Sequence, residues 1–262
     1  MKLLTGLAIA CALSAGSFSA QAFPGKKGEP VIHLDRSMSG VLRDKQFYNS
    51  KFTGWGIYNA RFENCALTRT NFDGVEGRKA RFNDTNFLDV SFVRANLQET
   101  RFVGSRNGGS MTRVKFTDAK APGIHFENVA ITHSYFLKTE MTGGLLEDVN
   151  ITNSHFSGAQ LTAARLTDVN LTNVVASEID FSSSNLTNVR LTNANLSKAV
   201  FVGSRLKNVN FVNTNLHQAD FTESRLSDVS FQNVSGLNAN TFVRACGSDI
   251  SGLPKGIHLP PC

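Results

Sequence analysis

The sequence is short of proline, of cysteine and of long apolar runs. Only 6 of its 262 residues are proline and 4 are cysteine, whereas 41% are hydrophobic and no long tract of biased composition interrupts the chain. This composition excludes a disordered protein and provides enough apolar side chains for one buried core. Beyond residue 22 no run approaches the roughly 18 consecutive apolar residues that a membrane-spanning helix requires. We therefore expect the mature protein to be soluble and to have no transmembrane segment.

The N-terminal segment has the features of an export signal. Residues 1–22 contain one positive charge at Lys2, an apolar stretch and then the small-residue sequence Ala20-Gln21-Ala22. These features predict a signal peptide that is cleaved after residue 22, and hence a periplasmic or secreted protein. Lipid attachment at Cys11 is the alternative, but the residues before it match a lipobox poorly.

A five-residue period dominates the rest of the chain. A bulky apolar residue recurs at every fifth position, and the residue two places before it is small or β-branched, as in Ala95 and Val149. Neither an α-helix nor a plain β-strand has this period. The phase of the pattern slips once, across residues 104–110. Aromatic centres of the pattern include Phe52, Phe62, Phe72, Phe82, Phe92, Phe102, Phe116, Phe126, Phe136, Phe156, Phe181 and Phe201.

A longer period of 20 residues is superimposed on the short one. Valines recur at this spacing from Val129 to Val229, and asparagines recur from Asn153 to Asn233. One turn therefore contains four five-residue sides, and equivalent residues of successive turns stack about 4.8 Å apart. We predict a square solenoid with one continuous core. The aligned asparagines are interpreted as ladders of side chains that bond to one another, not as a ligand site.

This pattern resembles that of the pentapeptide repeat family, in which a small residue, Asp or Asn, and Leu or Phe precede two variable positions. Ala194-Asn195-Leu196-Ser197-Lys198 and Ala219-Asp220-Phe221-Thr222-Glu223 are two matches. The resemblance implies an all-β fold, a right-handed quadrilateral parallel β-helix of about nine coils. We predict a signal peptide at residues 1–22, an N-terminal cap or linker at 23–46, the β-helix at 47–240 with its register slip at 104–110, and a C-terminal cap at 241–262.

Three cysteines remain after the predicted cleavage. Cys246 and Cys262 lie 16 residues apart in a proline-containing tail, where a disulfide would close a loop and fix the end of the chain. Cys65 occupies a small, buried position of the repeat, so we interpret it as a packing residue rather than a reactive thiol. Because solenoid ends expose unpaired strand edges, they require caps, and one end could also support a homodimer.

The sequence lacks the motifs of catalytic and cofactor sites. It has no nucleophile elbow, no phosphate-binding glycine loop and no paired-cysteine metal motif. No two of its six histidines are 20 residues apart; only His133 and His155, 22 apart, could be neighbours across a corner. We therefore predict no catalytic residue, no metal site and no cofactor.

Positive charge gathers in the N-terminal half. Residues 23–120 contain 17 Lys and Arg against 10 Asp and Glu, whereas residues 121–262 contain 9 against 11. Three arginines precede phenylalanines at 20-residue spacing and are predicted to form an outward column, which we continue across the slip with a lysine: Arg61, Arg81, Arg101 and Lys120. A second, interrupted set is predicted on the adjacent side at Arg165, Arg205 and Arg225. Like charges held about 4.8 Å apart are unfavourable unless an anion bridges them.

These observations favour a non-catalytic, exported binding scaffold that docks an anionic protein or envelope component through its basic N-terminal half. The alternative for the arginine column is a solvated face with scattered counter-charges such as Glu63 and Asp84. The resemblance implies interaction scaffolds, some of which mimic DNA and bind gyrase, so gyrase binding and a secreted host-directed effector are the alternative functions. A basic, exported protein departs from the acidic pattern of a DNA mimic. The absence of aromatic residues interleaved with the column argues against nucleic acid as the partner.

Overall fold

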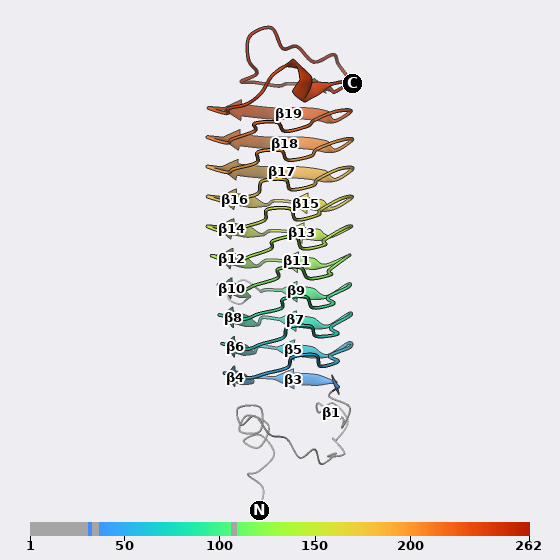
Figure 1. Cartoon of the computed structure of the whole chain (residues 1–262), viewed down its shortest axis with the longest axis vertical. Coiled ribbons are helices and arrows are strands. Elements are labelled where there is room, and N and C mark those ends of the chain that lie inside the picture. Colours follow the sequence, from blue (N-terminus) through green and yellow to red (C-terminus); the bar gives the residue numbers. More distant parts are fainter. Residues whose placement is uncertain (1–30, 33–36, 106–108) are drawn as a thin grey trace, which may run out of the picture.

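The computed structural model describes residues 31–32, 37–105 and 109–262, which form a straight parallel β-solenoid of about ten coils (Figure 1). The predicted signal peptide at 1–22 and part of the predicted cap at 23–46 lie outside the described residues. In the part of the chain that is described, no helix has the length and apolar composition needed to cross a bilayer.

Two adjacent sides of each coil form β-strands. The strands of the first side are β3 (Val41–Arg43), β5 (Arg61–Glu63), β7 (Arg81–Asn83), β9 (Arg101–Val103), β11 (His125–Glu127), β13 (Leu145–Glu147) and β15 (Arg165–Thr167). Those of the second side are β4 (Gln46–Tyr48), β6 (Ala66–Thr68), β8 (Asn86–Leu88), β10 (Ser110–Thr112), β12 (Ala130–Thr132), β14 (Asn150–Thr152) and β16 (Asn170–Thr172). Three longer strands run across both sides: β17 (Asn185–Thr192), β18 (Arg205–Val212) and β19 (Arg225–Gln232).

The remaining elements lie at the two ends. Before the first coil, β1 (Val31–Ile32) pairs antiparallel with β2 (Met38–Ser39). After the last coil, the 3-10 helix η1 (Ala239–Phe242) is followed by β20 (Cys246–Ser248), which pairs in parallel with β19. On the third and fourth sides, successive coils are joined by single parallel bridges rather than by strands.

A left-handed residue turns the chain at the end of each side. It lies two positions after the bulky centre and has a positive φ, for example 49° at Asn153 and 54° at Asn173. Asn and Asp tolerate this conformation better than other residues with a Cβ, which explains their recurrence in the sequence. The predicted amide ladder is present: Asn173 Nδ2 donates to Asn153 Oδ1 at 3.1 Å, and the same bond repeats from coil to coil through Asn193, Asn213 and Asn233.

The bulky centres fill the interior, and in the lower coils most of them are phenylalanines. Two ladders of nearly parallel rings run along the axis, with centroids 4.4 to 5.2 Å apart in one and 4.6 to 5.1 Å apart in the other. The first ladder contains Phe52, Phe72, Phe92, Phe116, Phe136 and Phe156, and the second contains Phe62, Phe82, Phe102 and Phe126. Each ladder meets the other edge to face, which is a favoured aromatic geometry.

The slip in the pattern is a four-residue insertion between β9 and β10. Phe62 and Phe82 are register partners 20 residues apart, but Phe102 and Phe126 are partners 24 residues apart. At the end of the insertion, Gly109 has φ of 91°, and a Cβ there would lie 2.6 Å from the Cα of Gly104, so only glycine fits. The insertion alters which residues share a column above it.

The solenoid begins earlier than the boundary predicted at residue 47. Strand β3 pairs with β5, and Leu42 is buried beneath Phe62, so residues 37–46 belong to the first coil. The reason is that Leu42 fills the core position that Phe62 fills in the coil above, and Met38 fills the one beneath Ile57. At the other end, the predicted cap is closed by Phe242, whose ring packs against Phe221 and Phe231.

Candidate functional site

The first side carries one column of residues that points outward along the whole solenoid. In register order it consists of Val41, Arg61, Arg81, Arg101, His125, Leu145, Arg165, Asn185, Arg205 and Arg225. All six arginines are exposed. We call these six residues, Arg61, Arg81, Arg101, Arg165, Arg205 and Arg225, the arginine column.

This register corrects two sequence-based predictions. Lys120 does not continue the column, because it pairs with Asn96 below and Glu140 above on a different side. The second arginine set, predicted on the adjacent side, lies in the same column as the first. Both errors have one cause. In a five-residue pattern, an insertion of four residues and a deletion of one shift the phase in the same way. The two differ by five residues, so they place every later residue on different sides of the coil.

Among the described residues, no counter-charge is in contact with the arginine column. Within the described residues, none of its six side chains forms an ion pair or a hydrogen bond. Two carboxylates beside the lower part of the column are engaged elsewhere: Glu63 pairs with Arg43 at 2.5 Å, and Asp84 accepts from the Ser105 backbone at 2.5 Å. Higher up, Asp168 accepts from Asn188. The column is therefore a line of unneutralised positive charge.

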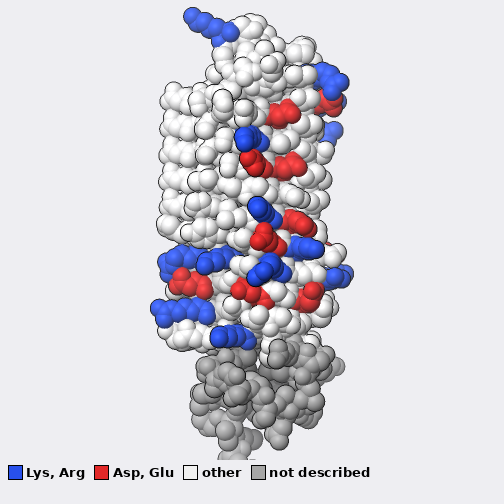
Figure 2. Space-filling model, viewed as in Figure 1, with Lys and Arg blue, Asp and Glu red and all other residues white. Residues whose placement is uncertain are grey.

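The charge is distributed unevenly over the surface. In the view of Figure 2, Lys, Arg, Asp and Glu cover the lower coils and the centre and right of the upper coils, whereas the upper left is free of charged side chains. On this face the lower coils are thus more densely charged than the upper coils.

His125 and Leu145 interrupt the arginine column, and two glutamates lie beside them. His125 Nε2 lies 3.4 Å from Glu127 Oε2 and 3.9 Å from Glu147 Oε2. The side chain of His125 is 12% exposed, and its Nε2 atom is buried without a hydrogen-bond partner. Burial lowers the pKa of His125 below its ordinary value, and Glu127 opposes this effect while Arg101 adds to it.

This cluster was not predicted from the sequence, because only pairs of histidines were considered as metal ligands. The available signal was a His-x-Glu sequence with a second glutamate 22 residues after the histidine, which a 20-residue coil places directly above the first glutamate. The histidine pair that we singled out has other neighbours. The ring of His155 stacks on Tyr135 at 5.1 Å, and His133 Nε2 lies 3.5 Å from Asn153 Nδ2.

The three cysteines lie in two environments. Cys246 and Cys262 are joined in a disulfide with a Cα–Cα distance of 4.9 Å. Cys65 is a free, buried thiol that donates to the Leu42 carbonyl at 3.3 Å. Burial raises the pKa of Cys65, which keeps the thiol protonated and unreactive.

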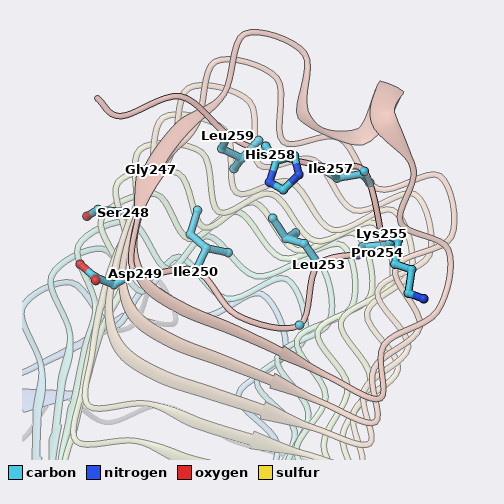
Figure 3. A pocket seen from close by; sticks show the side chains of 12 residues that line it. Gly247, Ser248, Asp249, Ile250, Leu253, Pro254, Lys255, Ile257, His258 and Leu259 are labelled. Carbon is cyan, nitrogen blue, oxygen red and sulfur yellow. The ribbon is translucent and has the colours of Figure 1, made fainter.

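The C-terminal cap contains an open hollow of about 420 Å³ (Figure 3). Ile250, Leu253, Ile257 and Leu259 contribute its apolar lining, and all four pack against the core of the last coils. The polar residues at its rim, among them Asp249 and Lys255, point away from one another in Figure 3. We interpret this hollow as part of the apolar cover of the solenoid end.

The comparisons with known proteins agree with this architecture. A family model described as "Pentapeptide repeat region" matches residues 56–136 and 164–241, and a second, "Pentapeptide repeats (8 copies)", matches residues 145–182. No curated protein gives a significant match to the sequence.

Two solved structures illustrate the likeness. The first is HetL, a pentapeptide repeat protein involved in heterocyst differentiation regulation in the cyanobacterium Nostoc sp. strain PCC 7120; it is 18% identical with a TM-score of 0.47, over 75% of this chain and 90% of HetL. The second is QnrB1, a plasmid-mediated fluoroquinolone resistance protein; it is 17% identical with a TM-score of 0.44, over 80% of this chain and 94% of QnrB1. Since the family models match more than half of its residues, the chain belongs to the pentapeptide repeat family.

Proposed function

We propose that the protein is an exported, non-catalytic scaffold that docks an extended anionic partner along its arginine column. The observation that carries the proposal is the column itself: six exposed arginines on one face, aligned by the register of the coils and unpaired within the described residues. From Arg61 to Arg225 the column crosses eight coil steps, a length of about 38 Å at the strand spacing.

The shape of the charge favours a linear partner over a broad anionic surface. On one flank, the corner at the end of the first side carries carboxylates such as Asp84, Asp148 and Asp228, which would repel a second row of anionic groups. On the other flank, the upper coils carry small neutral residues such as Thr142 and Ala163. The positive charge is thus a narrow line that matches a polyanionic chain lying parallel to the solenoid axis.

The sign of the charge also separates this function from DNA mimicry. A DNA mimic presents regularly spaced negative charges, whereas the arginine column presents positive charges. The catalytic alternative has no support in the pattern of residues, since the column contains neither a nucleophile nor an acid–base pair. A rigid rod with a charged edge is suited to binding.

Binding to a synthetic polyanion tests the proposal. The probe is labelled poly-L-glutamate of more than about 12 residues, the number needed to span the column when extended. We compare the full chain with two triple variants, Arg61→Ser/Arg81→Ser/Arg101→Ser and Arg165→Ser/Arg205→Ser/Arg225→Ser. Each triple variant is expected to weaken binding at least about tenfold at low salt, because half of the attractive charge is removed.

A control variant removes the same amount of charge from a different face. Lys51, Lys115 and Lys138 are exposed and lie on the third side, so the triple Lys→Ser variant should bind the polymer as the unchanged protein does. If all three variants weakened polymer binding equally, the net charge of the protein would explain the effect, and the proposed site would be overturned. Unchanged binding by both arginine variants would overturn it too.

Export is tested separately from binding. The predicted signal peptide should be absent from protein recovered outside the cytoplasm, so that N-terminal sequencing begins at Phe23. An N-terminus at Met1, or a cytoplasmic location, would remove the exported part of the proposal and leave the binding site untouched.

A further inference from the structure

The structure places three metal-binding side chains together where the arginine column is interrupted. His125 and Glu127 are two residues apart on β11, so both point outward from the same face of the strand. Glu147 lies on β13 in register with Glu127. One ligand atom from each of the three residues lies within 4.8 Å of the others.

The cluster is not satisfied by the protein itself. The Nε2 atom of His125 is buried and makes no hydrogen bond, although two carboxylates lie within 4 Å of it. The carboxylates of Glu127 and Glu147 stand opposite each other in register, and each is also without a hydrogen bond among the described residues. Two adjacent carboxylates repel each other, and a buried polar nitrogen without a partner is costly.

We infer that His125, Glu127 and Glu147 bind a divalent zinc-class metal ion. One imidazole nitrogen and two carboxylate oxygens suit Zn²⁺, whereas Ca²⁺ and Mg²⁺ prefer sites made only of oxygen. In a tetrahedral site with ligands about 2.0–2.1 Å from the metal, ligand atoms are about 3.3 Å apart. The separations of 3.4 and 3.9 Å from Nε2 to the two carboxylates are close to that value.

The surroundings are consistent with an accessible, three-ligand site. The glutamates are 37% and 39% exposed, so an ion can enter from solvent and keep water as a further ligand. The two carboxylates balance the double charge of the ion, and Arg101, one coil below His125, opposes its binding. The bound ion would join two successive coils through their side chains.

Titration of the untagged full chain with ZnCl₂ tests the inference, after removal of metals with a chelator. Calorimetry at neutral pH should show one ion bound per chain, and Co²⁺ should produce the visible absorption of a protein-bound ion. His125→Gln and Glu147→Gln should each weaken binding at least about tenfold, since each removes one of three ligands. Circular dichroism confirms that the variants are folded, and because they lie on different coils, one can be read if the other is unstable.

The matched controls are His155→Gln and Glu140→Gln, which replace the same residue types on other sides of the solenoid. Both should bind Zn²⁺ as the unchanged protein does, and Zn²⁺ should raise the thermal midpoint of the controls but not of the His125 variant. The absence of one-to-one binding in the unchanged protein would overturn the inference. Binding of Zn²⁺ by the His125 and Glu147 variants as tightly as by the unchanged protein would also overturn it.

Discussion

The lower and upper coils of this solenoid share one backbone but are stabilised differently. In the lower coils the core is built on two ladders of phenylalanine rings, one continuing to Phe126 and the other to Phe156, whereas most centres from Leu161 to Leu196 are aliphatic. The outer corners differ in the opposite sense. The upper coils have hydrogen-bonded ladders of asparagine, such as Asn173 to Asn193, and the lower coils place the charged residues Arg69, Asp89 and Arg113 at the same left-handed corner.

This difference shows that the coil geometry can be maintained from inside or from outside. Stacked aromatic rings add attraction beyond the burial of their area. Amide ladders instead satisfy polar groups and stabilise a backbone conformation that most side chains disfavour. The lower corners adopt the same left-handed conformation without an asparagine ladder, and they carry charged side chains such as Arg69.

Removing one phenylalanine ring should have the largest effect on the free energy of unfolding. The loss should be larger in the lower coils than in the upper coils. Phe82 packs against five other phenylalanine rings, whereas Phe181 packs against one. Phe82→Ala and Phe181→Ala should each lower the free energy of unfolding by about 3–5 kcal/mol, with Phe82→Ala at the upper end. Urea unfolding measures the two values, and Phe82→Leu is the control that keeps most of the volume. Equal losses at the two positions would show that the aromatic ladders add nothing to burial.

The disulfide should have the next largest effect, confined to the upper end. Cys246→Ser with Cys262→Ser opens a loop of 16 residues, which by chain entropy corresponds to about 3 kcal/mol. We expect the C-terminal cap to become sensitive to limited proteolysis while the coils below stay resistant. Cys65→Ala, in the first coils, is the control and should leave the cap resistant. A cap that resists protease equally without the disulfide would contradict the expectation.

The fold was predictable from the sequence because its signal is repeated in every coil. The five-residue spacing of Phe and Leu identifies the inward positions, and the 20-residue spacing of Asn identifies the corners; the structure confirms the all-β solenoid on both counts. The register across residues 104–110 was not predictable. Phase alone does not distinguish four residues gained from one lost, and that ambiguity misplaced Lys120 and separated Arg165 from Arg101.

The candidate sites were predictable only where the repeat itself places them. Arg61, Arg81 and Arg101 share a coil position below the insertion, and their column is as expected. The His125 cluster depends on which side chains from two coils meet, and no spacing rule for a single residue type reveals it. Likewise, the first coil begins before residue 47 because Leu42 stands where the next coils have phenylalanine, and Met38 fills the core beneath Ile57.

Breaking the amide ladder should have an intermediate effect in the upper coils. Asn193 has φ of 51°, donates to Asn173 and accepts from Asn213. Asn193→Ala should destabilise by about 2 kcal/mol, because it loses both hydrogen bonds and strains the left-handed backbone. Asn193→Gly removes the bonds without the strain and should cost about 1 kcal/mol. Thermal unfolding separates the two terms, and identical midpoints for the two variants would contradict the role of backbone strain.

The reciprocal change in the lower coils should stabilise. Arg69 occupies a left-handed position with φ of 50°, where Asn is better tolerated. Arg69→Asn should therefore raise the free energy of unfolding by a few tenths of a kcal/mol, about the difference between residue types in this conformation. Because Arg69 also donates to the Tyr48 hydroxyl, Tyr48→Phe is the control for the loss of that bond. A destabilised Arg69→Asn protein would mean that the lower corners depend on their charged side chains.

The smallest effect should come from an ion pair that joins two lower coils across the insertion. Arg113 Nε lies 2.5 Å from Asp89 Oδ1, and this guanidinium lowers the pKa of the Asp89 carboxyl below its ordinary value. A lowered pKa in the folded state means that the pair stabilises the protein above the ordinary aspartate pKa of about 3.9. This contribution is lost as the pH falls through the lower, folded-state value. Solvent exposure keeps it small.

Arg113→Gln tests this pair through the titration of Asp89 itself. NMR of the Asp89 carboxyl should show its pKa returning toward the ordinary value, and the pH of acid unfolding should shift upward only slightly. Arg94→Gln removes a positive charge that makes no ion pair with the described residues and does not contribute to the lowered pKa of Asp89, so it should leave the Asp89 titration unchanged. An Asp89 pKa that Arg113→Gln does not alter would show that the two coils are held together across the insertion by their core and backbone bonds alone.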